Sequence, residues 1–401
     1  MSVFANNLKI EKGESLLLVA LALFGMDFML QGIMVLIVYG FYFVMTNKGT
    51  SVPGNSTILA FSLLFLLFYM FVPVFELSIL KTMVAISLAF LLGSRMKNCT
   101  PEKIVFYMVF VAFFMALHAM LNMYYNFSQM GMMAIAERAS YDFWTRDISS
   151  STGQASKMTP FLACSFYLIM YNKNKALKYL SIILLLLNII YDLELGGRSA
   201  LVLLFFTIIL SYLIGSIRAK SAGSSAKFLV ILVFFCIAIF FAYEANLFGI
   251  QDLFENSSFN QRFNGVSGQD INEDDRTRRK IIYLQNLLTY PFGGQHLCND
   301  LKIGHAHDLW LDTFDMAGLI PLFILLYYTY SSIIRAYRLY KKQTVDPYKA
   351  TVILTFFVIM NAQFYLEPII EGSPKLFIYY CLIDAMVSQC LMKQNYNLTV
   401  R

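Results

Sequence analysis

The sequence predicts an all-α protein that crosses a membrane about twelve times, and composition is the first reason. Of the 401 residues, 58% are hydrophobic and only 14% are charged, whereas soluble domains carry about 25% charged residues. The second reason is that the apolar residues form long runs, and a helix needs about 20 of them to cross the hydrocarbon core. The third is that lysines and arginines gather in alternate short loops. We therefore expect one integral membrane domain over residues 1–401.

Two apolar runs are too long for one helix and are expected to form hairpins of two helices each. The run 15–46 is interrupted by GMDFMLQG (25–32), and the run 177–214 by DLELGGRS (192–199). The remaining runs each predict one crossing, at residues 57–75, 77–94, 103–125, 158–172, 228–243, 309–334, 349–366 and 375–392.

The distribution of positive charge predicts which side each loop faces. With a cytoplasmic N-terminus, the short basic loops all fall on the cytoplasmic side, as the positive-inside tendency requires. Both termini are then cytoplasmic, and the two long loops, 126–157 and 244–307, face outward. The net charge of +6 does not indicate nucleic-acid binding, because the basic residues are scattered and form no single basic face. The short cytoplasmic loops contain no Gly-rich phosphate-binding motif, so any chemistry is expected on the outer face.

The larger outward loop contains a predicted amphipathic helix from Asp274 to Tyr290, which ends at the sequence PFGG (291–294). Its first turns carry a basic cluster, Arg276, Arg278, Arg279 and Lys280. Such a cluster can contact anionic lipid headgroups. It can also bind a specific anion, since a helix N-terminus adds backbone N–H donors.

Arg198 lies at the tip of the second hairpin, directly after Gly196 and Gly197. An arginine between two apolar helices needs an anionic partner or access to the interface. It can reach the interface and pair with Asp192 or Glu194. Alternatively, it can clamp a phosphate, because a guanidinium forms bidentate bonds to phosphate oxygens.

Histidines gather where the larger loop re-enters the membrane, in the sequence GHAHDLWLD (304–312). His305, His307 and Asp308 allow three interpretations: exposed loop residues, a metal site with Cys298 or His296, or a general base suited to neutral pH. His118, inside a predicted span, is more typical of a satisfied interior histidine. Glu367 and Glu371 lie near span ends, where they can line a polar cavity or pair structurally.

Three stretches together resemble the superfamily of O-antigen polymerases (Wzy-type) and O-antigen ligases (WaaL-type). They are GGRSA at the hairpin tip, the helix from Arg276 to PFGG, and HDLWL (307–311) followed by Asp315 and Gly318-Leu319. Members of that superfamily carry His-Asn-x-x-Leu at the third element, and here Asp308 replaces the asparagine. Arg276 best matches the family's spacing to the proline.

The resemblance implies a GT-C-like glycosyltransferase of the bacterial inner membrane whose active site faces the periplasm. The donor would be an oligosaccharide on undecaprenyl diphosphate, transferred with inversion and without metal or cofactor. Arg198, Arg276 and His307 would be catalytic, and Arg278, Arg279, His305 and Asp308 would bind substrate. The expected partners are that lipid-linked oligosaccharide, membrane lipid and a polysaccharide chain-length regulator.

The sequence is compatible with several functions. A polymerase would transfer the growing glycan onto the next lipid-linked repeat unit, whereas a ligase would transfer it onto lipid A-core. A flippase for the same lipid is a further alternative, although transporters usually place charges near the bilayer midplane, often on broken helices within two repeated halves. A non-catalytic scaffold would be indifferent to loss of Arg198 or His307.

Overall fold

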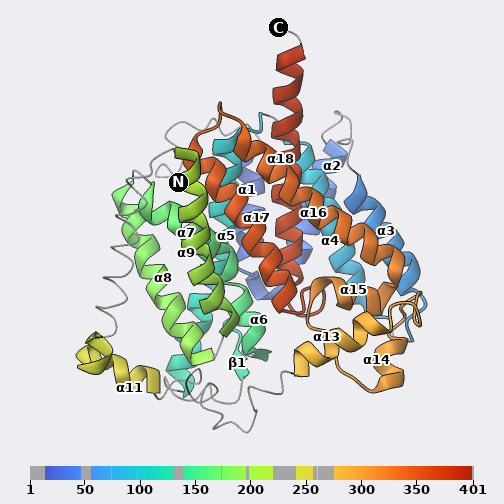
Figure 1. The fold of residues 1–401 in the computed structure, drawn as a ribbon, viewed down its shortest axis with the longest axis horizontal. Coiled ribbons are helices and arrows are strands. Elements are labelled where there is room, and N and C mark those ends of the chain that lie inside the picture. Colours follow the sequence, from blue (N-terminus) through green and yellow to red (C-terminus); the bar gives the residue numbers. More distant parts are fainter. Residues whose placement is uncertain are drawn as a thin grey trace.

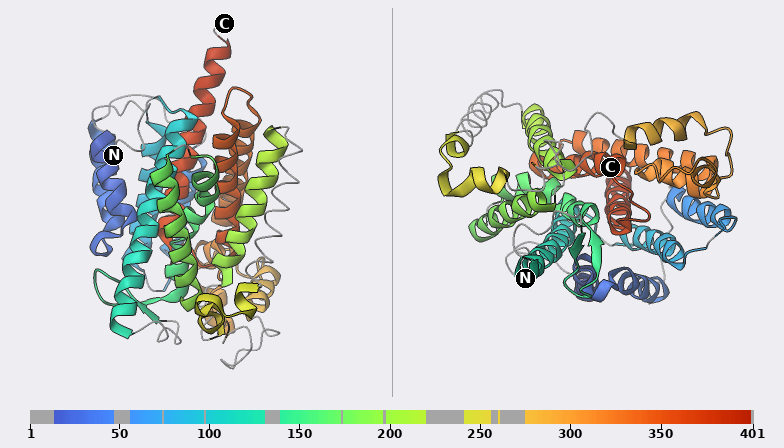
Figure 2. Two further views of the ribbon diagram at one scale, coloured as in Figure 1. Left: turned by 90° about the vertical axis from the view of Figure 1, so that its left-hand side faces the viewer. Right: turned by 90° about the horizontal axis from the view of Figure 1, so that it is seen from below.

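The computed structural model is a bundle of helices, with short helices and a β-hairpin gathered at one end (Figures 1 and 2). It describes residues 14–46, 56–73, 75–96, 98–130, 139–172, 174–195, 198–219, 241–255, 260 and 275–399. The helices of the bundle are α1 (Glu14–Gly25), α2 (Gly32–Thr46), α3 (Thr57–Tyr69), α4 (Leu77–Ser94), α5 (Pro101–Met130), α7 (Thr159–Met170), α8 (Lys175–Leu195), α9 (Arg198–Ala219), α16 (Leu319–Lys341), α17 (Pro347–Leu366) and α18 (Pro374–Thr399).

Short elements gather at the end of the bundle opposite the start of α1 and the end of α18 (Figure 1). The antiparallel strands of the β-hairpin are β1 (Ala139–Tyr141) and β2 (Ile148–Ser150). The short helices among the described residues are η1 (Phe28–Leu30), α6 (Ser151–Ser156), η3 (Leu247–Gly249), α11 (Ile250–Glu255), α13 (Asp275–Gln285), α14 (His296–Leu301) and α15 (Leu309–Ala317). We call this end of the molecule, which holds α13, α14 and α15, the loop end.

The prediction of an all-α polytopic membrane protein is confirmed. Within the described residues, seven helices are long and apolar enough to cross a membrane, namely α4, α5, α8, α9, α16, α17 and α18. Many large apolar side chains on their outer faces are exposed, such as Val202 (63%) and Phe323 (62%). A helix that is apolar on the face toward the bundle and also on the face away from it is typical of a membrane span.

The bundle is held by close helix packing and by buried polar pairs. The long helix α18 runs along α4, and a Cβ added at Gly93 would clash with the Leu382 carbonyl. Such small residues let two backbones approach closely. Between α16 and α18, Arg335 donates two hydrogen bonds, of 2.8 and 2.7 Å, to the buried carboxylate of Asp384. A bidentate pair of this kind satisfies a charge that would otherwise be costly to bury.

Both predicted hairpins are found as pairs of helices. The helices α1 and α2 are separated by η1, and α8 and α9 are separated at residues 196–197, which lie outside the described residues. The expected span 228–243 also falls largely outside them. The expected interior position of His118 is confirmed, since it is fully buried and its Nε2 lies 3.1 Å from Asp142.

The prediction of one continuous span over residues 309–334 is wrong. The chain forms α15, ends it at Gly318, and starts α16 at Leu319. Gly318 has φ 84° and ψ −170°, a conformation that is essentially restricted to glycine. Pro321 then falls in the first turn of α16, where its missing N–H costs nothing. With nine residues, α15 is too short to span a membrane.

The predicted helix from Asp274 to Tyr290 is shorter than expected. It covers Asp275–Gln285 as α13, and hydrogen-bonded turns around Asn286 lead to Pro291. One face of this helix packs against the protein and another face is exposed. Tyr283 is fully buried in a small apolar cluster with Leu297 and Phe314, whereas Ile281 and Leu284 are exposed.

Candidate functional site

The functional candidates meet at the loop end, and a network around Glu367 joins the hairpin tip to α13. Glu367 follows α17 and is 3% exposed. The hydroxyl of Ser199, in the first turn of α9, donates a 3.0 Å hydrogen bond to its Oε1. Arg276 places Nη1 3.6 Å from the same oxygen and donates a 3.2 Å hydrogen bond to the Leu366 carbonyl. The side chain of Arg198 lies outside the described part, but its backbone starts α9 one residue before Ser199.

The burial of Glu367 makes its contact with Arg276 one that a stronger anion can replace. Burial raises the pKa of Glu367, and the guanidinium of Arg276 only partly opposes that rise. A buried carboxylate is a poor permanent partner, because its desolvation offsets much of the attraction to a cation. Arg276 is therefore available to a stronger anion such as a phosphate.

A second contact joins α13 to the start of α15. Asp308 is the N-cap of α15, and its Oδ1 accepts a 2.7 Å hydrogen bond from the Leu311 amide. Its Oδ2 lies 3.6 Å from Nζ of Lys280, which also sits over the ring of Tyr365. Aspartate and asparagine cap helices equally well. Asp308 therefore caps α15 as well as an asparagine would, and it adds an ion pair with Lys280.

His307 lies among cationic side chains. Its backbone is in the left-handed region, at φ 59°, and its buried Nδ1 has no hydrogen-bond partner among the described residues. Burial, and then the charges of Arg276 and Arg279, lower the pKa of His307 to about 4. The imidazole is therefore neutral at pH 7 and able to accept a proton.

Arg279 reaches this group because Gly304 has no side chain. A Cβ at Gly304 would collide with Nη1 of Arg279. Arg278, between the two inward-facing arginines, is exposed. Of the three arginines in the basic cluster, Arg276 and Arg279 thus turn toward His307.

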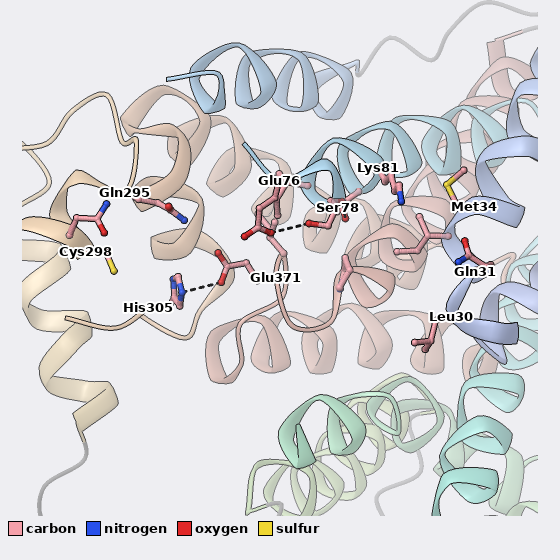
Figure 3. Close-up of a pocket in the computed structure, with 16 residues that line it drawn as sticks. Leu30, Gln31, Met34, Glu76, Ser78, Lys81, Gln295, Cys298, His305 and Glu371 are labelled. Atoms are coloured by element: carbon pink, nitrogen blue, oxygen red, sulfur yellow. Dashed lines mark hydrogen bonds and ion pairs between the residues drawn. The ribbon is translucent and has the colours of Figure 1, made fainter. Parts of the chain in front are cut away.

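His305 points to the other side. Its Nε2 lies 3.3 Å from Oε2 of Glu371, in the turn between α17 and α18. The pair borders a cavity of about 580 Å³ that opens between α2, α4, α14 and α18. Figure 3 shows His305 and Glu371 facing one another at one end of this cavity.

Backbone hydrogen bonds join the PFGG turn (291–294) to the break between α15 and α16. Leu319 donates to the Pro291 carbonyl (2.9 Å) and Gly294 to the Met316 carbonyl (3.1 Å). A Cβ at Gly318 would collide with the Pro291 carbonyl. The PFGG turn thus holds the break between α15 and α16 in place, and with it the segment that carries His307.

The structure therefore brings together Arg276, Arg279, Lys280, His307 and Asp308, and it places the start of α9 beside them through Ser199. His305 instead faces Glu371 and the cavity. Sequence reasoning did not find Ser199 or Tyr365, because neither residue type signals a site without its neighbours. Among the residues that the structure describes, no group of three or more His, Cys, Asp or Glu side chains could hold a metal ion.

No family model matches the sequence, and no curated protein matches it significantly. The class that the fold and composition define is a helical, polytopic membrane protein. A polar site lies at one end of its bundle.

Proposed function

We propose that this protein is a surface-polysaccharide polymerase of the bacterial inner membrane. It would transfer a growing glycan from undecaprenyl diphosphate to the next lipid-linked repeat unit. The observation that carries the proposal is that α13 brings Arg279 against Gly304 and Lys280 against Asp308, on either side of His307, whose pKa these cations and Arg276 help to lower. Fixed cations beside a potential base suit the departure of an anionic leaving group together with the deprotonation of a hydroxyl.

The topology that goes with this proposal has about twelve spans in a GT-C-like arrangement. The loop end would face the periplasm, and both termini would be cytoplasmic. In support, the start of α1 and the end of α18 lie at the same end of the bundle, away from α13 and α15 (Figure 1). The exposed Ile281 and Leu284 on α13 suit contact with the membrane surface.

The mechanism follows from the charges. A hydroxyl oxygen of the acceptor sugar forms a bond to the anomeric carbon of the donor. The bond from that carbon to the diphosphate oxygen breaks, and undecaprenyl diphosphate leaves with the electron pair. Arg276 and Arg279, with Arg198 from the adjoining hairpin, stabilise the developing negative charge, and His307 takes the hydroxyl proton. A single displacement inverts the anomeric centre.

Binding of the donor also strengthens the base. In the free protein, nearby positive charges help to hold the pKa of His307 low. A bound diphosphate offsets those charges, so the pKa of His307 rises toward the range of an effective general base. Base strength thus increases only when the donor is present.

The test uses a strain that lacks the gene, complemented with wild type or with His307→Ala at matched expression. Lipopolysaccharide is then separated on a gel. A core that carries one repeat unit in the deletion strain supports the polymerase. Bare core, with long chains retained on undecaprenyl diphosphate, identifies a ligase. An unchanged ladder in the deletion strain overturns the proposal, and an unchanged ladder with His307→Ala removes the proposed base.

A further inference from the structure

The cavity beside His305 is built by segments that are far apart in the sequence. Gln31 comes from the turn before α2, Ser78 and Lys81 come from the start of α4, and Gln295 directly precedes α14. In Figure 3 these residues lie on different walls, with the His305–Glu371 pair toward the α14 side. At about 580 Å³, the cavity has the size of a small-molecule site.

Its polar side chains are of the types that recognise hydroxyl groups. A sugar hydroxyl donates one hydrogen bond and accepts others, so a sugar site needs both donors and acceptors. The side-chain amides of Gln31 and Gln295 supply both, and Lys81 supplies a donor. None of these three side chains makes a hydrogen bond or ion pair within the described residues. Ser78, in contrast, already donates a 3.0 Å hydrogen bond to Glu76.

The charge of the cavity differs from that of the neighbouring arginine site. Its walls carry Glu76 and Glu371 against Lys81, so they show no excess of positive charge to attract a phosphate. Arg276 and Arg279 instead act on His307, which does not line the cavity. An anionic headgroup therefore prefers the arginine side, and an uncharged polar group prefers the cavity.

Resting on the proposed transfer reaction, we infer that this cavity binds the acceptor sugar and selects an uncharged, hydroxyl-rich one. Glu371, held by His305, accepts a hydrogen bond from one acceptor hydroxyl, and the amides of Gln31 and Gln295 bind others. The reacting hydroxyl lies at the His305 end of the cavity, since His305 is the lining residue nearest to His307 in the sequence. Glu371 binds the acceptor, His305 positions Glu371, and neither exchanges a proton with the substrate.

The first experiment measures binding alone. The probe is the oligosaccharide repeat released by mild acid from the host's own lipid-linked intermediates, tested by saturation-transfer NMR with the purified protein. Gln31→Trp fills the cavity and is expected to abolish the signal. Tyr179→Trp is the matched control, because Tyr179 is 63% exposed on α8, away from the cavity. Signal that survives Gln31→Trp, or no signal with wild type, overturns the inference.

The second experiment uses a variant that keeps the shape of the site. Glu371→Gln keeps the size of the side chain and loses its charge. We expect about a tenfold higher KM for the acceptor, as for loss of one good hydrogen bond, with kcat nearly unchanged. A fall in kcat at unchanged KM contradicts a binding role in the acceptor site.

Failure of this inference differs from failure of the proposed function. If the deletion strain loses its ladder but Gln31→Trp restores it as well as wild type does, the polymerase stands and the acceptor lies elsewhere. If the ladder survives the deletion, the transfer reaction itself is wrong, whatever the NMR experiment reports.

Discussion

Replacing Arg276 by glutamine should separate catalysis from folding. The side chain of Arg276 is 36% exposed, and its guanidinium lies 3.6 Å from the carboxylate of Glu367. Discounted for that exposure, its loss costs about 1–2 kcal/mol of folding free energy. The hydrogen bond from Ser199 to Glu367 remains, and burial already favours the protonated form of this carboxyl.

The effect on turnover should be much larger. Removing one preorganised charge-stabilising donor typically lowers kcat about 10²–10³-fold, or roughly 3–4 kcal/mol. The assay extends lipid-linked repeat units with purified protein, and thermal unfolding in the same detergent reports the fold. Arg338→Gln, at an exposed position near the opposite end of α16, is the matched control and should retain activity. Equal losses of turnover in both variants, or normal turnover of Arg276→Gln, would refute the proposal that Arg276 stabilises the leaving diphosphate.

Four further predictions address the pKa of the base, the pH dependence of stability, the contact between Gly318 and Pro291, and the absence of a metal requirement. The pKa of His307 in the free protein is lowered to about 4. As the pH is lowered, kcat/KM should therefore begin to fall only near pH 4. A fall near pH 6.5 that is absent in His307→Gln would contradict this. Because the pKa of His307 is lower in the folded protein than in the unfolded chain, the unfolded chain takes up the proton at a higher pH. The free energy of unfolding should therefore fall as the pH drops from about 6.5 toward 4. His307→Gln should make the unfolding temperature less dependent on pH in this range. Gly318→Ala should lower the free energy of unfolding by about 1–3 kcal/mol more than Gly249→Ala does, because both glycines have positive φ but only Gly318 is crowded by neighbouring atoms. Equal unfolding temperatures of the two variants would show that the close contact of Gly318 with Pro291 does not stabilise the fold. Finally, chelation of divalent ions should leave transfer unchanged, because arginines supply the positive charge, and activity that is lost on chelation and restored by a metal would contradict this.

The sequence predicts the fold well where hydropathy dominates. Both hairpins and most spans are visible as apolar runs, because crossing a membrane requires about 20 apolar residues in a helix. The break at Gly318 is not visible in this way, since the run 309–334 is apolar on both sides of it. Only the contact of Gly318 with Pro291 shows why the helix ends there.

The site was predictable in part, for a similar physical reason. Arg276 and His307 stand out because charged and titratable side chains are rare in an apolar chain. Their link through Glu367 and Ser199 depends on three segments that meet only in the folded bundle. The amide-lined cavity gives even less signal, because an isolated glutamine such as Gln31 or Gln295 is ordinary in any loop.

The most direct test of the central claim is reconstitution with a single substrate. Purified protein in liposomes is given only the lipid-linked single repeat unit, and products are analysed by mass spectrometry. We predict a ladder of lipid-linked oligomers, with one undecaprenyl diphosphate released for each bond formed, and loss of that ladder with Arg276→Gln. If the repeat unit stays monomeric while the protein is folded, or is only moved across the bilayer, the protein is not a polymerase.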